Sequence, residues 1–153
     1  MAQSPSHKFG QIIGDVLEQM LMRSFSEFAD AHDLYLDYKH ARKARGNRKK
    51  VSWVDHKGNK HDLDYVFEAG GSEAVIGTPK AFIESAWRRY TKHSRNKAQE
   101  IQGAVAVLAE TYQDHSPFLG VVLAGVFPLT TCTNDDLAFS VSVICSVSTK
   151  LAA

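Results

Sequence analysis

Apolar side chains recur at three- and four-residue spacing from Phe9 towards Lys43. This period matches the 3.6-residue turn of an α-helix and predicts one long helix with a break near His32. The members of the stripe are Phe9, Ile12, Ile13, Val16, Leu17, Met20, Leu21, Phe25 and Phe28. An apolar stripe of this length must pack against another element, or against a second copy if the protein is a helix-rich oligomer.

Shorter, β-prone runs follow the helix. Residues 51–55 and 62–67 flank the turn "HKGNK", in which Gly58 and Asn59 tolerate positive φ, so we expect a β-hairpin. Residues 81–87 form a third predicted strand. After Pro117, the continuous apolar run "FLGVVLAGVF" is typical of a strand covered on both faces, and "LAFSVSVICSV" is a candidate last strand.

A second helix is predicted between the third strand and Pro117, because Ala98, Ile101, Val105 and Leu108 return to helical spacing. The resulting order is α-β-β-β-α-β, which predicts a single α/β domain over residues 1–153, with a central mixed sheet of roughly four to five strands flanked by helices. We expect residues 1–8 to be flexible. Residues from about 130 to 153 lack a closing helix, so we expect a truncated or altered C-terminal end.

Composition places the chain among globular proteins. Its 153 residues are enough for one domain with its own core, and the 44% apolar and 23% charged content excludes a mainly disordered chain. The N-terminus lacks a signal peptide and no apolar run is long enough to span a bilayer, so we expect a cytoplasmic protein without a membrane partner. Cys132 and Cys145 lack a C-x-x-C spacing, which favours free thiols.

Positive charge is concentrated in two segments, although the net charge is only +1. The basic tract "KHARKARGNRKK", residues 39–50, and the segment "RRYTKHSRNK", residues 88–97, either are solvated loops or bind the phosphate backbone of a nucleic acid. The second segment stands before a predicted helix, where cations oppose the helix dipole and need an anion. The candidate nucleic-acid contacts are Arg42, Lys43, Arg45, Arg48, Lys49, Lys50, Arg88, Arg89 and Arg95.

Acidic residues in two of the predicted strands are candidates for a metal site. If the strands of "HDLDYVFE" and "AFIESAW" are neighbours, Asp64 and Glu84 can converge, and two carboxylates within about 5 Å need a cation or a shared proton. Carboxylate oxygens favour Mg²⁺, for which Mn²⁺ could substitute. Asp62 is better explained as a solvated charge at a strand edge.

This order of elements, with Asp64 on the second strand, Glu84 on the third and the segment "ESAWRRYTKHSRNKAQEIQGA", resembles the PD-(D/E)XK nuclease superfamily over residues 9–127. The resemblance implies a restriction-endonuclease-like fold and a Mg²⁺-dependent DNA endonuclease of restriction type. It implies double-stranded DNA as substrate, a homodimer as one option, and Asp64 and Glu84 as metal ligands. Glu18, four residues after Gly14, resembles a third acidic residue of such sites, although its helical phase predicts exposure.

The sequence departs from the family pattern where a lysine is expected two residues after the glutamate, because that position is Ala86. Arg88, Lys92 and Lys97 are the replacements nearby. An arginine stays protonated and serves only as a charge clamp, so Lys92 and Lys97 are the catalytic candidates. Ala86 also favours an alternative, a non-catalytic nucleic-acid-binding protein that retains the nuclease fold.

Overall fold

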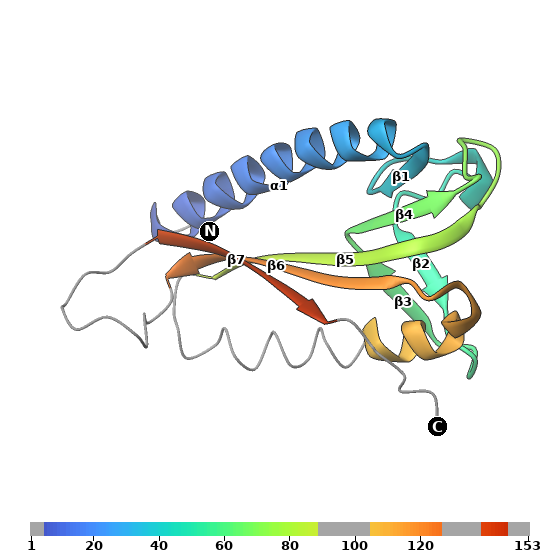
Figure 1. Ribbon diagram of the computed structural model, residues 1–153. Coiled ribbons are helices and arrows are strands. Elements are labelled where there is room, and N and C mark those ends of the chain that lie inside the picture. Colours follow the sequence, from blue (N-terminus) through green and yellow to red (C-terminus); the bar gives the residue numbers. More distant parts are fainter. Residues whose placement is uncertain (1–4, 89–104, 127–138, 147–153) are drawn as a thin grey trace, which may run out of the picture.

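The computed structural model describes residues 5–88, 105–126 and 139–146. Its main feature is a five-stranded mixed sheet in the order β1-β4-β5-β6-β7, next to a separate two-stranded sheet, β2-β3 (Figure 1). β5 and β6 are parallel, and the other neighbouring strands of the large sheet are antiparallel. The predicted α/β class with a mixed sheet is therefore confirmed.

The elements have the following bounds. The large sheet contains β1 (Leu34–Tyr38), β4 (Tyr65–Ala69), β5 (Thr78–Arg88), β6 (Phe118–Val126) and β7 (Phe139–Ser146). The small sheet contains β2 (Val51–Val54) and β3 (Lys60–Leu63). Helix α1 spans Pro5–Ala31, residues 105–111 are helical, and two 3₁₀ turns are η1 (Lys43–Arg45) and η2 (Gln113–His115).

The first helix ends earlier in the chain than the sequence pattern predicts. It begins at Pro5, a residue that suits the first turn of a helix, and it ends at Ala31 rather than near Lys43. Asp33 then adopts a left-handed φ of 54°, and β1 starts at Leu34. The basic tract is therefore a loop containing η1, not the end of a helix.

The predicted strand over residues 62–67 is two strands separated by Asp64. β3 pairs with β2, as the predicted hairpin requires, whereas β4 pairs with β1 and β5 in the other sheet. Leu63 and Tyr65 would share a face in an unbroken strand, yet they belong to apolar clusters on opposite faces of the large sheet. The chain therefore bends at Asp64, and the prediction that the first three strands form one sheet is wrong.

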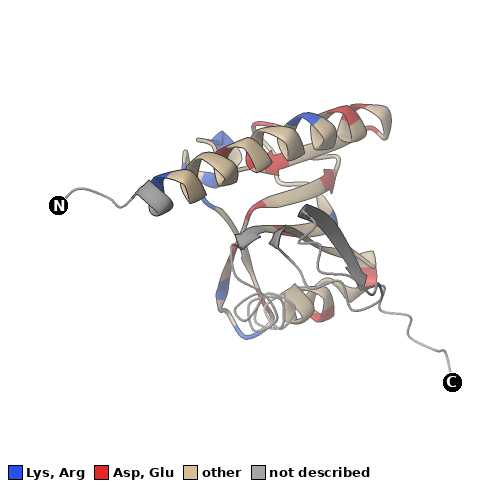
Figure 2. Ribbon diagram, turned by 90° about the vertical axis from the view of Figure 1, so that its left-hand side faces the viewer, with Lys and Arg blue, Asp and Glu red and all other residues tan. Residues whose placement is uncertain are grey.

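The large sheet lies between α1 on one face and the helical residues 105–111 on the other (Figure 2), and an apolar cluster fills each side. On the α1 side, Phe25 packs edge-on against Tyr65 and Phe67, with ring centroids 5.1 and 5.5 Å apart. The opposite cluster joins the β2-β3 hairpin and the helical residues 105–111 to the sheet through Val51, Trp53, Leu63, Val66, Phe82, Val105, Leu108, Leu119 and Val121. β6 contributes to both layers, as its continuous apolar run predicts.

Among the described residues, the predicted apolar stripe of α1 packs against the core in its C-terminal part. Leu21 and Phe25 lie against the sheet, whereas Phe9, Val16 and Met20 are exposed.

Within the described ranges, no helix has the length and apolar content needed to cross a membrane.

Candidate functional site

A hollow of about 590 Å³ lies between α1 and the sheet, where β4 begins and β5 approaches its end. Among the described residues, three acidic side chains line it, together with two basic ones and a serine. The described lining residues are Asp15, Glu18, Gln19, Met22, Arg23, Tyr38, Lys39, Asp64, Tyr65 and Ser85. The hollow thus contains two of the acidic residues that the sequence singles out, Asp64 and Glu18.

Asp64 is held in the hollow by the neighbouring strand. Its Oδ2 accepts one hydrogen bond from the backbone N–H of Ser85 at 2.8 Å and another from the Ser85 hydroxyl at 2.9 Å. The other carboxylate oxygen, Oδ1, has no hydrogen bond to any residue that the structure describes. A carboxylate oriented in this way keeps one oxygen for a ligand.

Glu84 precedes Ser85 on β5, and its position relative to Asp64 follows from the register of the strands. The β4-β5 ladder pairs Tyr65 with Ile83, so Asp64 and Glu84 are the next residues of two neighbouring strands. Because side chains alternate along a strand, Ser85 lies on the face of Ile83 and Glu84 on the opposite face. Ser85 lines the hollow, and the half-buried Glu84 is not among its described lining residues.

The acidic residues of α1 approach Asp64 from the other side. Glu18 is exposed, as its helical phase predicts, and it lines the hollow with Asp15. The Tyr65 hydroxyl donates to the backbone carbonyl of Glu18 at 3.4 Å, which links α1 to β4. Burial, together with the charges of Glu18 and Asp64, raises the pKa of Tyr65 to about 12, so this hydroxyl remains neutral at physiological pH.

The hollow contains carboxylate oxygens, which are the type of ligand that a hard cation prefers. In the described part of the chain, no three His, Cys, Asp or Glu residues are grouped so that they could hold a metal ion by themselves. Mg²⁺ is commonly bound through one or two carboxylates, with water and phosphate oxygens completing its shell. Asp64 and Glu18 could therefore provide the protein oxygens of such a site, whereas Glu84 faces the opposite side of the sheet, so the predicted convergence of Asp64 and Glu84 is not seen in this hollow.

Comparison with known proteins identifies no family for this chain. No family model matches it, and no curated protein or solved structure matches it significantly.

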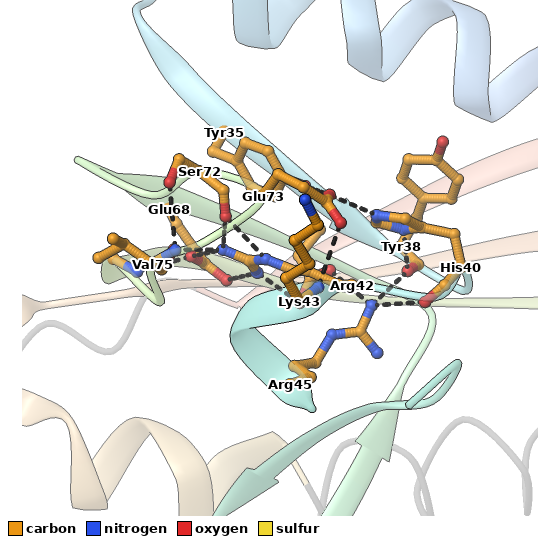
Figure 3. A network of polar contacts seen from close by, with 12 residues as sticks. Tyr35, Tyr38, His40, Arg42, Lys43, Arg45, Glu68, Ser72, Glu73 and Val75 are labelled. Atoms are coloured by element: carbon orange, nitrogen blue, oxygen red, sulfur yellow. Dashed lines mark hydrogen bonds and ion pairs between the residues drawn. The ribbon is translucent and has the colours of Figure 1, made fainter. Parts of the chain in front are cut away.

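Arg42, from the basic tract, lies at the centre of a buried network (Figure 3). Its guanidinium donates to both oxygens of the Glu68 carboxylate, at 2.7 and 2.9 Å, and lies 2.8 Å from the Asp37 carboxylate. All three side chains are 0% exposed. Further hydrogen bonds to the backbone carbonyls of Ser72 and Val75 fix the loop between β4 and β5.

Two residues that the sequence suggested as nucleic-acid contacts are thus used inside the protein. Arg42 is buried, and Arg45, with a side chain only 7% exposed, donates to Asp37 at 2.9 Å. A buried carboxylate requires a paired cation. Arg42 and Arg45 are the cations paired with the buried carboxylates of Asp37 and Glu68. We therefore correct the assignment of Arg42 and Arg45 to nucleic acid.

The remaining basic residues of the tract are accessible. Lys43, Arg48, Lys49 and Lys50 are exposed. Lys50 Nζ lies 2.6 Å from Asp62, which lowers the pKa of that carboxyl group and explains Asp62 as a surface charge of β3. The side chains of Arg88, Arg89, Lys92, Arg95 and Lys97 lie outside the described residues.

Proposed function

We propose that this chain is a Mg²⁺-dependent endonuclease of the restriction-endonuclease-like fold, acting on double-stranded DNA. The observation that supports this most is the position of Asp64. It stands at the start of β4, is oriented by Ser85 of β5, and faces a hollow that also contains Glu18 and Lys39.

The topology of the sheet also supports the proposal. Helix α1 is followed by three antiparallel strands, β1, β4 and β5, then by the helical residues 105–111 and by β6, which is parallel to β5. This is the α-β-β-β-α-β order that the resemblance implies, with the β2-β3 hairpin inserted after the first strand. Asp64 precedes the second strand of this series, and Glu84 lies on the third.

The acidic residues of the hollow and the exposed cations of the basic tract suggest two separate roles. Asp15, Glu18 and Asp64 would repel a phosphate group unless a cation lay between them. Mg²⁺ bound there would act as a Lewis acid on a phosphate oxygen. Asp64 would hold the ion, with Glu18 as the second carboxylate of the hollow, while the exposed Lys43, Arg48, Lys49 and Lys50 bind the DNA backbone.

Plasmid nicking tests the proposal. We expect cleavage of supercoiled DNA with Mg²⁺ or Mn²⁺ and none with EDTA, and we expect Asp64→Asn and Glu18→Gln to abolish it. Asp62→Asn is the matched control, because Asp62 lies two residues away and outside the lining of the hollow. Cleavage by Asp64→Asn at the wild-type rate would sink the nuclease assignment.

The second candidate, a non-catalytic nucleic-acid-binding protein with the same fold, is favoured by Ala86 at the position of the expected lysine. It predicts salt-sensitive DNA binding without metal-dependent cleavage in the wild-type protein. Binding measured by fluorescence anisotropy beside the nicking assay separates the two candidates.

A further inference from the structure

Lys39 belongs both to the basic tract and to the hollow around Asp64. Among the described residues of the tract, it alone lines the hollow. We infer that Lys39 provides the ammonium group that contacts the scissile phosphate, in place of the lysine that is missing at Ala86. This inference rests on the proposed nuclease function and names a residue that the sequence pattern did not indicate.

The register of the sheet places Lys39 next to Asp64. The β1-β4 ladder ends at the pair Tyr38 and Tyr65, so Lys39 and Asp64 are each one residue beyond it, at the same end of two neighbouring strands. Lys39 and Asp64 both line the hollow at this end of the sheet.

The backbone on both sides of Lys39 is fixed. Tyr38 is paired within the sheet, and its carbonyl oxygen accepts from the backbone N–H of His40 at 2.8 Å. The His40 ring stacks on the ring of Tyr38 at a centroid distance of 4.3 Å and interacts with Glu73 (Figure 3). Lys39 therefore projects from a rigid segment, which a group that acts on a phosphate needs.

The ammonium group of Lys39 is available. Lys39 is exposed and has no hydrogen bond or ion pair with any residue that the structure describes. By contrast, Arg42 and Arg45 hold buried carboxylates, and Arg23, the other cation that lines the hollow, lies 3.1 Å from Glu27. Lys39 is thus free to bind an incoming anion.

In the reaction, a P–O bond forms to the oxygen of water and the P–O bond to one sugar oxygen breaks. One hydrogen of the water remains on the new terminal phosphate, and the other ends on the leaving alcohol. Lys39 donates a hydrogen bond to a non-bridging phosphate oxygen as negative charge accumulates there, and its own protonation is unchanged over the cycle.

The test compares single-turnover cleavage and DNA affinity in six variants of the full chain. Lys39→Met should lower the cleavage rate by roughly 100-fold, the scale of one lost transition-state donor, while its DNA affinity in EDTA falls far less than the rate. Lys39→Arg should recover part of the rate, because it restores a charged donor. Lys57→Met is the matched control, since Lys57 is exposed in the turn between β2 and β3, outside the basic tract and outside the described lining of the hollow. Asp64→Asn is the reference for loss of cleavage.

The outcomes separate this inference from the proposed function. If the wild type shows no cleavage that depends on Asp64, the nuclease function fails and the role of Lys39 fails with it. If cleavage depends on Asp64 but Lys39→Met cleaves as fast as Lys57→Met, only the role of Lys39 is overturned. A loss of rate in Lys92→Met or Lys97→Met, with Lys39→Met unaffected, would assign the role to those residues. Circular dichroism melts identify variants that do not fold, and Lys39→Gln then replaces Lys39→Met.

Discussion

The guanidinium of Arg42 and the carboxylate of Glu68 form two hydrogen bonds, of 2.7 and 2.9 Å, with both side chains fully buried. Arg42 comes from the basic tract and Glu68 from β4, so this pair joins the loop that carries the tract to the large sheet (Figure 3). The tract therefore has two parts. Arg42 and Arg45 form ion pairs inside the protein, whereas the exposed cations of the tract remain available for a ligand.

Replacing Arg42 by methionine should strongly destabilise the fold, because Glu68 and Asp37 would lose a buried partner. We expect the free energy of unfolding to fall by about 3–5 kcal/mol in urea denaturation. Lys49→Met is the control on the exposed part of the tract and should change it by less than about 0.5 kcal/mol. The double variant Arg42→Met, Glu68→Met should recover part of the loss. A loss below about 1 kcal/mol for Arg42→Met would mean that the pair acts like a surface ion pair.

The exposed cations of the tract should determine how DNA affinity depends on salt. Each phosphate contact releases counterions, so Arg48→Ala and Lys49→Ala should each make the slope of log K against log[salt] less steep by about 0.9. Lys57→Ala, in the turn between β2 and β3, is the control with an exposed lysine outside the tract. Anisotropy titrations at several salt concentrations measure the slope. Equal slopes in all three variants would exclude the tract from the DNA interface.

The elements of the fold that the sequence predicts well are those with an unambiguous apolar period. β6 is a continuous apolar run, and both its faces are covered. β1 is missed because its five residues are too short a segment to distinguish a period of 2 from the end of a helix. Its strand conformation depends on pairing with β4, which is distant in sequence. The bend at Asp64 is missed for the same reason, since β3 and β4 pair with different sheets.

The candidate site is predictable only in part. Asp64 is indicated by its place before an alternating run, but its partner Ser85 depends on the register between β4 and β5. Lys39 enters the hollow because β1 ends beside Asp64, and β1 was not predicted. Arg42 could not be separated from the exposed cations, because the charge pattern of the tract is the same whether an arginine is solvated or buried.

The turn between β2 and β3 provides a pH-dependent prediction. The Asp55 carboxylate accepts from the backbone N–H groups of Lys57 and Asn59, from the Asn59 side chain, and interacts with His61 at 2.9 Å. The hydrogen bond with His61, followed by those with Asn59 and Lys57, lowers the pKa of Asp55. Because the folded pKa lies below the unfolded value of about 4, this stabilisation is complete above pH 4 and is lost as the pH falls through the folded pKa.

We therefore expect Asp55→Ala to lower the melting temperature at pH 7, and the difference from the wild type to narrow in acid below about pH 4. Thermal melts between pH 7 and pH 2 measure both effects. Asp114→Ala removes an exposed carboxylate in η2 and should leave the melting temperature nearly unchanged at each pH. A difference between Asp55→Ala and wild type that grows on acidification would contradict the assignment.

Two glycines should respond in opposite directions to replacement by alanine. A Cβ at Gly77 would lie 2.5 Å from the carbonyl oxygen of Ala69 and closer still to the backbone nitrogen of Gly71, and backbone atoms there cannot move aside cheaply. The Gly77 N–H also donates to Glu68 at 2.7 Å, so the clash reaches the Arg42 network. We expect Gly77→Ala to lower the free energy of unfolding by about 1–3 kcal/mol, as overpacking does.

Gly14 is the matched control, because it lies within α1 and a Cβ there would meet nothing within 4 Å. Alanine is favoured over glycine inside a helix by about 0.8–1.0 kcal/mol, so Gly14→Ala should raise the free energy of unfolding by up to that amount. Urea denaturation of both variants measures the two changes under the same conditions. A Gly77→Ala variant as stable as the wild type would show that the loop between β4 and β5 can open away from Ala69, and that the Arg42 network does not depend on its close packing.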